Sequence, residues 1–192
     1  LESNNNSTRS NDGRADPYGG FWIGTMGLAA EPHAGSIYRF FEGEIVKLFP
    51  NITISNSICF SPDKKSGYFC DTPERKIMRV SLDQKGWPSS DPEVFIDLQE
   101  TNLNPDGAVI DLSGYLWSAQ WGASRVARYD RNGCFVSELK FNAKQISCPA
   151  FGGKNMSTLF ATSASVDLDD ASPNDGNCLL YTSPSPRDRF LS

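Results

Sequence analysis

Three polar residues recur at nearly even spacing in this chain, and their chemistry suits a metal ion. Asn11 lies in a Ser-Asn-Asp-Gly segment, Asn56 follows 45 residues later in Ser-Asn-Ser, and Asp106 follows after another 50 in Pro-Asp-Gly. Amide and carboxylate oxygens are the ligands that hard divalent cations prefer. The single histidine, His33, disfavours a serine-histidine triad or a histidine-rich zinc site. We predict that Asn56 and Asp106 are two metal ligands. Another repeat of this pattern must add at least one acid to complete the site.

Arg9 lies two residues before Asn11, a spacing that puts both side chains on one face of an extended segment. A guanidinium group presents a fork of N–H donors, and an amide both donates and accepts. Together they suit the hydroxyl and carbonyl groups of a sugar-like ligand, so we predict that Arg9 and Asn11 contact the substrate. The three polar segments are also ordinary turn sequences, and a purely structural role is the alternative.

The same pattern of short strands follows each polar segment. Alternating apolar and polar residues predict strands at 21–24, 36–40 and 45–49; at 58–61, 67–70, 76–81 and 94–96; at 108–111, 115–119, 124–129 and 135–139; and at 148–151 and 158–162. Repeats of this length are typical of a β-propeller, in which equivalent positions meet at one mouth of the central channel. We expect an all-β fold, a partial propeller with about four blades of which the last is incomplete.

Four aromatic residues lie within the expected strands: Trp22, Phe60, Phe69 and Trp117. Large aromatic side chains at such positions usually fill the space between packed sheets. We assign them to blade-to-blade packing and not to a binding stripe.

Composition excludes several classes of partner. The net charge is −5 and long basic runs are absent, which argues against nucleic acid. No apolar run approaches the roughly 18 residues that span a membrane. Five cysteines without a C-x-x-C pair indicate free thiols in a reducing compartment, with a Cys59–Cys70 bridge as the open alternative. We expect a cytoplasmic protein, although a signal peptide could precede Leu1.

The C-terminal segment breaks the rhythm of the repeat. Residues 178–192 contain Ser-Pro-Ser-Pro-Arg-Asp and look like the translation of a sequencing adapter. We expect a propeller over residues 1–177 and a non-native tail over 178–192. The alternative is a genuine Pro/Ser-rich tail.

An ordered series of motifs resembles the SMP-30/gluconolactonase/LRE family over roughly residues 7–177. The motifs are Arg9–Gly13, Asp16-Pro17, Phe21–Met26, Gly35–Tyr38, Ile54–Ser57, Phe60–Asp63, Pro105–Gly107, Leu116-Trp117, Trp121-Gly122, Arg125-Val126 and Phe151–Gly153. The resemblance implies a six-bladed propeller that binds one divalent metal and hydrolyses sugar lactones, as a carboxylic ester hydrolase. Ca²⁺ is the expected ion, with Zn²⁺, Mn²⁺ and Mg²⁺ as alternatives.

The resemblance also implies roles for particular residues. Asn56 and Asp106 match metal ligands, Asp106 matches the candidate acid/base, and Arg9 and Asn11 match substrate contacts. The family's metal-binding Glu lies in an N-terminal blade outside this chain, so we expect the chain alone to be inactive.

A second departure concerns substrate choice. Some members carry a substrate-contacting Glu three residues past the Thr-Met pair, where this chain has Ala29, and the nearest acid is Glu31. Two other functions remain open: a non-catalytic calcium-binding or regulatory protein, and a propeller scaffold for protein contacts.

Overall fold

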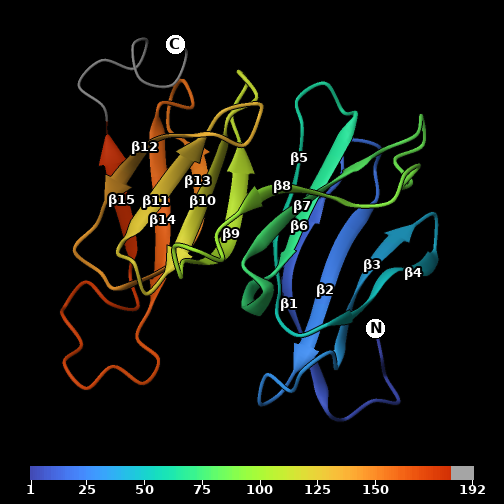
Figure 1. Ribbon diagram of the computed structural model, residues 1–192, viewed down its shortest axis with the longest axis horizontal. Helices are drawn as coiled ribbons and strands as arrows, with labels where there is room; N and C mark the ends of the chain where they lie inside the picture. Colours follow the sequence, from blue (N-terminus) through green and yellow to red (C-terminus); the bar gives the residue numbers. More distant parts are fainter. Residues whose placement is uncertain (183–192) are drawn as a thin grey trace. The chain divides into compact units, whose positions relative to one another are not determined.

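The computed structural model describes residues 1–182, which form fifteen strands and one three-residue 3₁₀ turn (Figure 1). The first sheet contains β1 (Thr8–Ala15), β2 (Phe21–Gly27), β3 (Gly35–Phe41) and β4 (Glu44–Ile52). The second contains β5 (Ser55–Phe60), β6 (Ser66–Asp71), β7 (Lys76–Ser81) and β8 (Glu93–Asp97), with the 3₁₀ turn Thr72–Glu74 between β6 and β7.

The other two sheets repeat this plan. The third contains β9 (Asn104–Ile110), β10 (Leu116–Trp121), β11 (Arg125–Tyr129) and β12 (Phe135–Lys140), and the fourth contains β13 (Gln145–Gly152), β14 (Thr158–Ala164) and β15 (Cys178–Thr182). In each sheet the strands pair antiparallel in chain order, which is the arrangement of propeller blades. The all-β prediction with four blades is therefore confirmed. The chain forms two compact units, Leu1–Asn102 with the first two blades and a second unit from Leu103 onward with the other two.

The polar segments lie inside the first strand of their blades, and not before it as the sequence pattern suggested. Pairing in β1 shifts register between Ser10 and Gly13, and pairing in β5 shifts between Asn56 and Cys59. A similar irregularity interrupts the β9–β10 pairing beside Asp106. A β-bulge inserts an extra residue and re-aims the local side chains, so these segments stay within the strand while departing from simple alternation.

Each unit has its own apolar core between its two blades. In the first unit Trp22 is fully buried and meets the ring of Phe60 edge-on at 5.2 Å, while Phe49 stacks on Phe69 at 4.3 Å. In the second unit Trp117 belongs to the buried cluster. The assignment of these aromatic residues to blade packing is confirmed.

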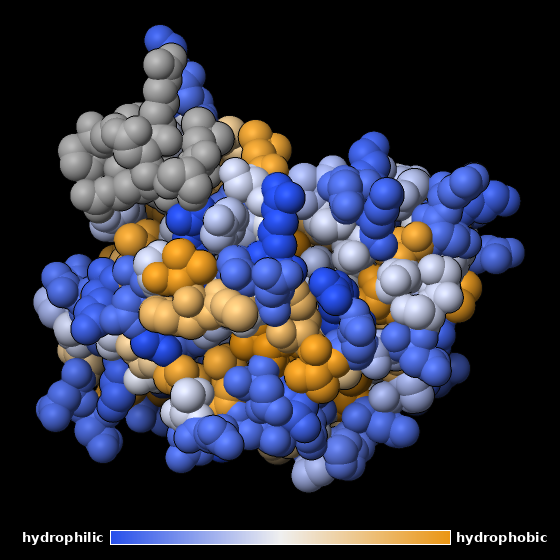
Figure 2. Space-filling model, turned by 45° about the horizontal axis from the view of Figure 1, so that its top comes forward, coloured by the Kyte–Doolittle hydropathy of each residue, from blue (hydrophilic) through white to orange (hydrophobic). Residues whose placement is uncertain are grey.

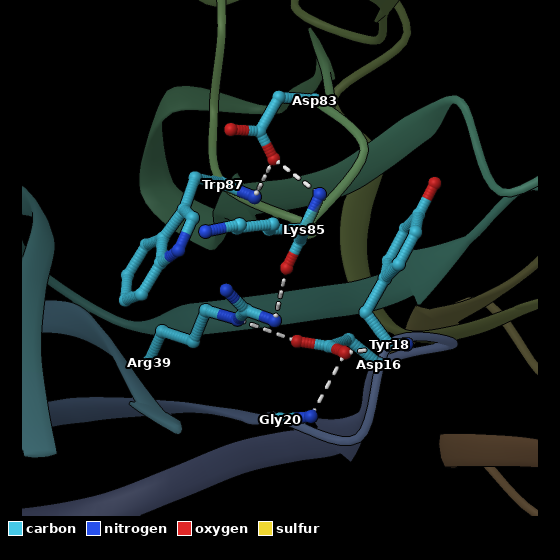
Figure 3. Close-up of polar contacts among 7 residues, drawn as sticks. All are labelled: Asp16, Tyr18, Gly20, Arg39, Asp83, Lys85 and Trp87. Carbon is cyan, nitrogen blue, oxygen red and sulfur yellow. Dashed lines mark hydrogen bonds and ion pairs between the residues drawn. The ribbon is translucent and has the colours of Figure 1, made fainter. Parts of the chain in front are cut away.

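A buried ion pair ties the first blade to the second (Figure 3). Arg39 Nε lies 2.6 Å from Asp16 Oδ2, and both side chains are completely buried. The other carboxylate oxygen, Asp16 Oδ1, accepts hydrogen bonds from the backbone N–H groups of Tyr18 and Gly20 at 2.8 and 3.0 Å. Arg39 Nη2 donates to the Lys85 carbonyl oxygen, 2.9 Å away in the β7–β8 loop. The pair therefore joins β3 to a loop of the neighbouring sheet.

Aromatic rings and a tight loop enclose the same guanidinium group. The Arg39 Cζ atom lies 4.4 Å from the ring centre of Phe41 and 4.3 Å from that of Trp87. Asp83 Oδ1 accepts from the backbone N–H groups of Lys85 and Trp87, which shapes the loop drawn in Figure 3. Cation–π contacts of this kind are strongest where water is excluded, as it is here.

The face drawn in Figure 2 carries apolar side chains as well as polar ones. Leu28, Leu112 and Phe135 are 60%, 82% and 55% exposed. Single exposed apolar residues of this kind are ordinary in globular proteins. Within residues 1–182, no helix has the length and apolar character that a membrane crossing needs.

The five cysteines are free thiols, as predicted, and no Cys59–Cys70 bridge forms. Cys59 and Cys70 are buried, and the Cys70 thiol donates to Ser57 Oγ at 3.4 Å. The cytoplasmic location stays a prediction.

The last blade extends further than expected. We predicted that it ends after its second strand, but Cys178–Thr182 forms β15, which pairs with β14 from Cys178 opposite Thr162 to Thr182 opposite Thr158. Residues 183–192 lie outside the described part of the chain, and the non-native origin of 178–192 stays a prediction.

Candidate metal and substrate site

Asn56 lies at the bulge of β5, and its amide group is held at both ends. The residue is only 6% exposed. Its Oδ1 accepts a hydrogen bond from Asn11 Nδ2 at 3.2 Å, and its Nδ2 donates to Thr72 Oγ1 at 2.9 Å. The following residue, Ser57, is buried with a φ of +58°, a left-handed conformation that non-glycine residues seldom adopt. Strained backbone persists only where the surrounding structure holds it, and it is found most often at functional sites.

Asn11 joins the first strands of the two blades. Besides Asn56, its Nδ2 donates to the Ser55 carbonyl oxygen at 2.9 Å. Its Oδ1 accepts from Arg9 Nη1 at 3.2 Å, and the same nitrogen donates to the Ser10 carbonyl oxygen. Three of the predicted site residues, Arg9, Asn11 and Asn56, thus form one hydrogen-bonded group in the first unit.

The neighbouring residue Asp12 has a structural role that we did not predict. Its Oδ2 accepts from the Ile58 N–H at 2.8 Å, and Arg14 Nε donates to the Ile58 carbonyl oxygen at 3.1 Å. Burial raises the pKa of the Asp12 carboxyl, and the hydrogen bonds from Ile58 and Gly13 and the charge of Arg14 only partly oppose this. The Ser-Asn-Asp-Gly segment therefore fastens β1 to β5 as well as presenting Asn11.

Asp106 belongs to the second unit, where it is half-buried at the irregularity of β9. The next residue must be small, because a Cβ atom at Gly107 would lie 2.7 Å from Cys148 Sγ and 2.8 Å from the Ser147 carbonyl oxygen. The first strand of the neighbouring blade, β13, thus packs directly against the backbone that follows Asp106.

Glu31 bends back toward the position where the expected acid is missing. Its Oε2 accepts from the Ala29 N–H at 3.0 Å, and a Cβ atom at Gly27 would collide with that oxygen at 2.0 Å. Glycine at 27 is therefore what allows the Glu31 carboxylate to lie against this loop.

The amide and carboxylate oxygens of Asn56 and Asp106 are of the type that binds a hard divalent cation, and they form part of a complete ligand set. A carbonyl-type oxygen has two lone pairs, and the hydrogen bond from Asn11 uses one of those on Asn56 Oδ1. The other is available to a cation. Among residues 1–182, no group of three or more His, Cys, Asp and Glu side chains gathers as a metal cluster.

Thr72 is the site neighbour that sequence reasoning missed. It follows β6, 16 residues after Asn56, at the start of the 3₁₀ turn. The repeat pattern compares equivalent positions of different blades, whereas Thr72 meets Asn56 within one blade. Only the Thr-Pro pair at 72–73, a common start for a helical turn, marks the position.

Comparison with known proteins places these features in context. A match to the family described as "SMP-30/Gluconolactonase/LRE-like region" spans residues 1–165. The chain is 38% identical to L-arabinolactonase of Azospirillum brasilense, over 85% of this chain and 55% of that protein. It is 34% identical to 6-deoxy-6-sulfogluconolactonase of Pseudomonas putida, over 82% and 54%.

A solved structure is similar over most of the described fold. It is that of a calcium-binding protein, regucalcin, from Agrobacterium tumefaciens, which is 46% identical with a TM-score of 0.91 and covers 94% of this chain and 63% of that one. The chain spans little more than half the length of the curated relatives it matches.

Proposed function

Because this chain belongs to the SMP-30/gluconolactonase/LRE-like family, we propose that the intact protein hydrolyses sugar lactones with the help of one divalent cation. The observation that carries the proposal is the group formed by Arg9, Asn11 and Asn56, which gathers a guanidinium, an amide and an amide oxygen at the first strands of two blades. Relatives named as lactonases of sugar acids support the same substrate class.

In this proposal Asn56 and Asp106 each supply an oxygen ligand to the cation. When bound, the cation would polarise the lactone carbonyl and stabilise the negative charge that develops on its oxygen. Asp106 takes a proton from the attacking water as the water oxygen bonds to the carbonyl carbon, and it returns this proton to the ring oxygen when the ring C–O bond breaks. The product is the open-chain hydroxy acid.

Arg9 and Asn11 orient the lactone ring. The guanidinium group has five N–H donors, and the described bonds to Ser10 and Asn11 use Nη1. Its remaining donors suit the acceptor oxygens of a polyhydroxylated ring. Holding the ring at a fixed distance from the attacking water makes the reaction effectively unimolecular, which is a large part of such catalysis.

A second candidate function is calcium binding without turnover. The solved regucalcin structure, described as a calcium-binding protein, supports it at 46% identity. Ca²⁺ is therefore the ion we propose first, and Zn²⁺, Mn²⁺ and Mg²⁺ are the alternatives.

The test is acid release from a panel of sugar lactones by the intact protein, with each metal and then with a chelator. Metal-dependent acid release supports the lactonase. If calorimetry detects calcium binding but no lactone of the panel releases acid, the lactonase is refuted and non-catalytic calcium binding is supported. If the protein shows no metal binding and no acid release, both the lactonase and the calcium-binding function are overturned and a scaffold is favoured.

A further inference from the structure

The hydrogen bonds around Asn56 have a definite direction. The Ser55 carbonyl oxygen can only accept, so the Asn11 atom 2.9 Å from it is the amide nitrogen. Arg9 can only donate, so the Asn11 atom that faces Arg9 Nη1 is the amide oxygen. Two groups with fixed roles therefore set the orientation of the Asn11 amide.

This orientation passes to Asn56. The nitrogen of Asn11 donates, so the Asn56 atom 3.2 Å from it is the oxygen. The Asn56 nitrogen then points the other way, and it donates to Thr72 Oγ1 at 2.9 Å. A reversed Asn56 amide would place two nitrogen donors against each other at Asn11, so the Asn11 contact excludes it and the Thr72 hydroxyl acts as the acceptor of the Asn56 nitrogen.

Thr72 is anchored independently of Asn56. Its backbone N–H donates to the Ile54 carbonyl oxygen at 3.0 Å, and its carbonyl oxygen accepts from the Arg75 N–H at 3.1 Å. The preceding Asp71 accepts from the N–H groups of Thr53 and Ile54 at 2.9 and 2.8 Å. Hydrogen bonds to Ile54 and Arg75 therefore hold the Thr72 backbone, which presents the hydroxyl to Asn56.

We propose that Thr72 is a positioning residue, whose hydroxyl holds the Asn56 amide with its oxygen available to the divalent cation. The inference rests on the proposed function, because it assumes that Asn56 is a ligand. Groups that orient a ligand in this way typically contribute 10- to 100-fold in metal affinity or activity. They do so without touching the ion.

The test compares Thr72→Val with Thr72→Ser in the intact protein, with Mn²⁺ affinity measured by calorimetry. Valine keeps the branched shape but removes the acceptor, and we expect about tenfold weaker binding. Serine keeps the hydroxyl, and we expect binding close to that of the unaltered protein. Thr101→Val is the matched control, because the Thr101 hydroxyl donates to the Leu98 carbonyl oxygen and not to Asn56.

A double-variant cycle separates positioning from general loss of structure. A carboxylate has two equivalent oxygens and no N–H group, so Asn56→Asp removes the need for an acceptor at Thr72. We expect Thr72→Val to weaken Mn²⁺ binding when Asn56 is present and to change it little when it is combined with Asn56→Asp. An equal loss in both backgrounds overturns the inference, since the effect then does not pass through the Asn56 amide.

The remaining outcomes are also decisive. Unchanged Mn²⁺ affinity in Thr72→Val overturns the inference while leaving the proposed function intact. If the unaltered protein binds none of Mn²⁺, Ca²⁺, Mg²⁺ or Zn²⁺, the proposed function fails and the inference fails with it. Melting curves recorded in chelator show whether each variant is folded before its affinity is compared.

Discussion

The amide nitrogen of Asn11 lies 3.2 Å from the amide oxygen of Asn56, although 45 residues separate them in the chain. The contact crosses from the first strand of one blade to the first strand of the next. It means that a residue predicted to contact substrate also supports a residue predicted to bind metal. Changes at Asn11 should therefore affect both functions.

Asn11→Ala is expected to raise KM for the lactone and to weaken metal binding. It removes the donor to the Ser55 carbonyl oxygen and to Asn56 Oδ1, at a cost of about 1–3 kcal/mol in the free energy of unfolding. Steady-state kinetics and urea unfolding of the intact protein measure the two effects. Asn5→Ala, which removes a local bond to Ser7, is the control. A variant with unchanged KM and metal affinity would show that the Asn11 contact is only structural.

Asp106→Asn is expected to lower kcat by about 100-fold or more, because the amide keeps an oxygen ligand but cannot accept the proton from water. Asp106→Ala should abolish turnover. The matched control is Asp130→Asn in the same unit, where Oδ1 accepts from the Asn132 and Cys134 N–H groups of a hairpin turn. Activity near that of the unaltered protein in Asp106→Ala would refute the assignment.

Asp16→Asn is expected to destabilise the first unit by about 3–5 kcal/mol, because it leaves the buried Arg39 charge without its partner. Asparagine can still accept from Tyr18 and Gly20, so the lost charge dominates the effect. Urea unfolding measures it. Glu93→Gln breaks the exposed pair with Arg79 and should cost less than about 1 kcal/mol. Similar costs for the two variants would show that burial of the Asp16–Arg39 pair does not matter.

Asp12 is expected to make stability fall as pH rises. Its folded-state pKa is raised above the ordinary value of 3.8 by burial, so the folded protein holds this proton more tightly than the unfolded chain does. The contribution is fully present below 3.8 and is lost as pH rises through the raised pKa. Asp12→Asn keeps an oxygen acceptor for the Ile58 N–H and does not titrate.

Comparing the unaltered protein with Asp12→Asn separates the effect of the Asp12 carboxyl on stability from the effects of other acids. Asp63, Asp83 and Asp175 have lowered pKa values, chiefly from hydrogen bonds, and they make stability rise with pH in both proteins. We therefore expect the free energy of unfolding of Asp12→Asn to gain on that of the unaltered protein between about pH 4 and neutrality. Parallel curves would mean that the Asp12 pKa is not raised.

Local sequence pattern determined the strands and the repeat. A strand exposes alternate residues to opposite faces, so its position can be read from its own residues, as for β6 and β7. The nearly even spacing of Asn11, Asn56 and Asp106 reflects the similar length of successive blades. The ordered motifs identified the family, which the match over residues 1–165 confirms.

Tertiary structure alone decided which side chains meet. The bulges that hold Asn11 and Asn56 depend on the register between neighbouring strands, and no single segment encodes that register. Thr72 faces Asn56, and Arg39 meets Asp16 in a water-free space, only because strands of one blade pair and the segments around them pack over these side chains. Alternation is a local property of the backbone, whereas a hydrogen bond between distant residues requires the position and twist of two whole sheets, and these arise only on folding.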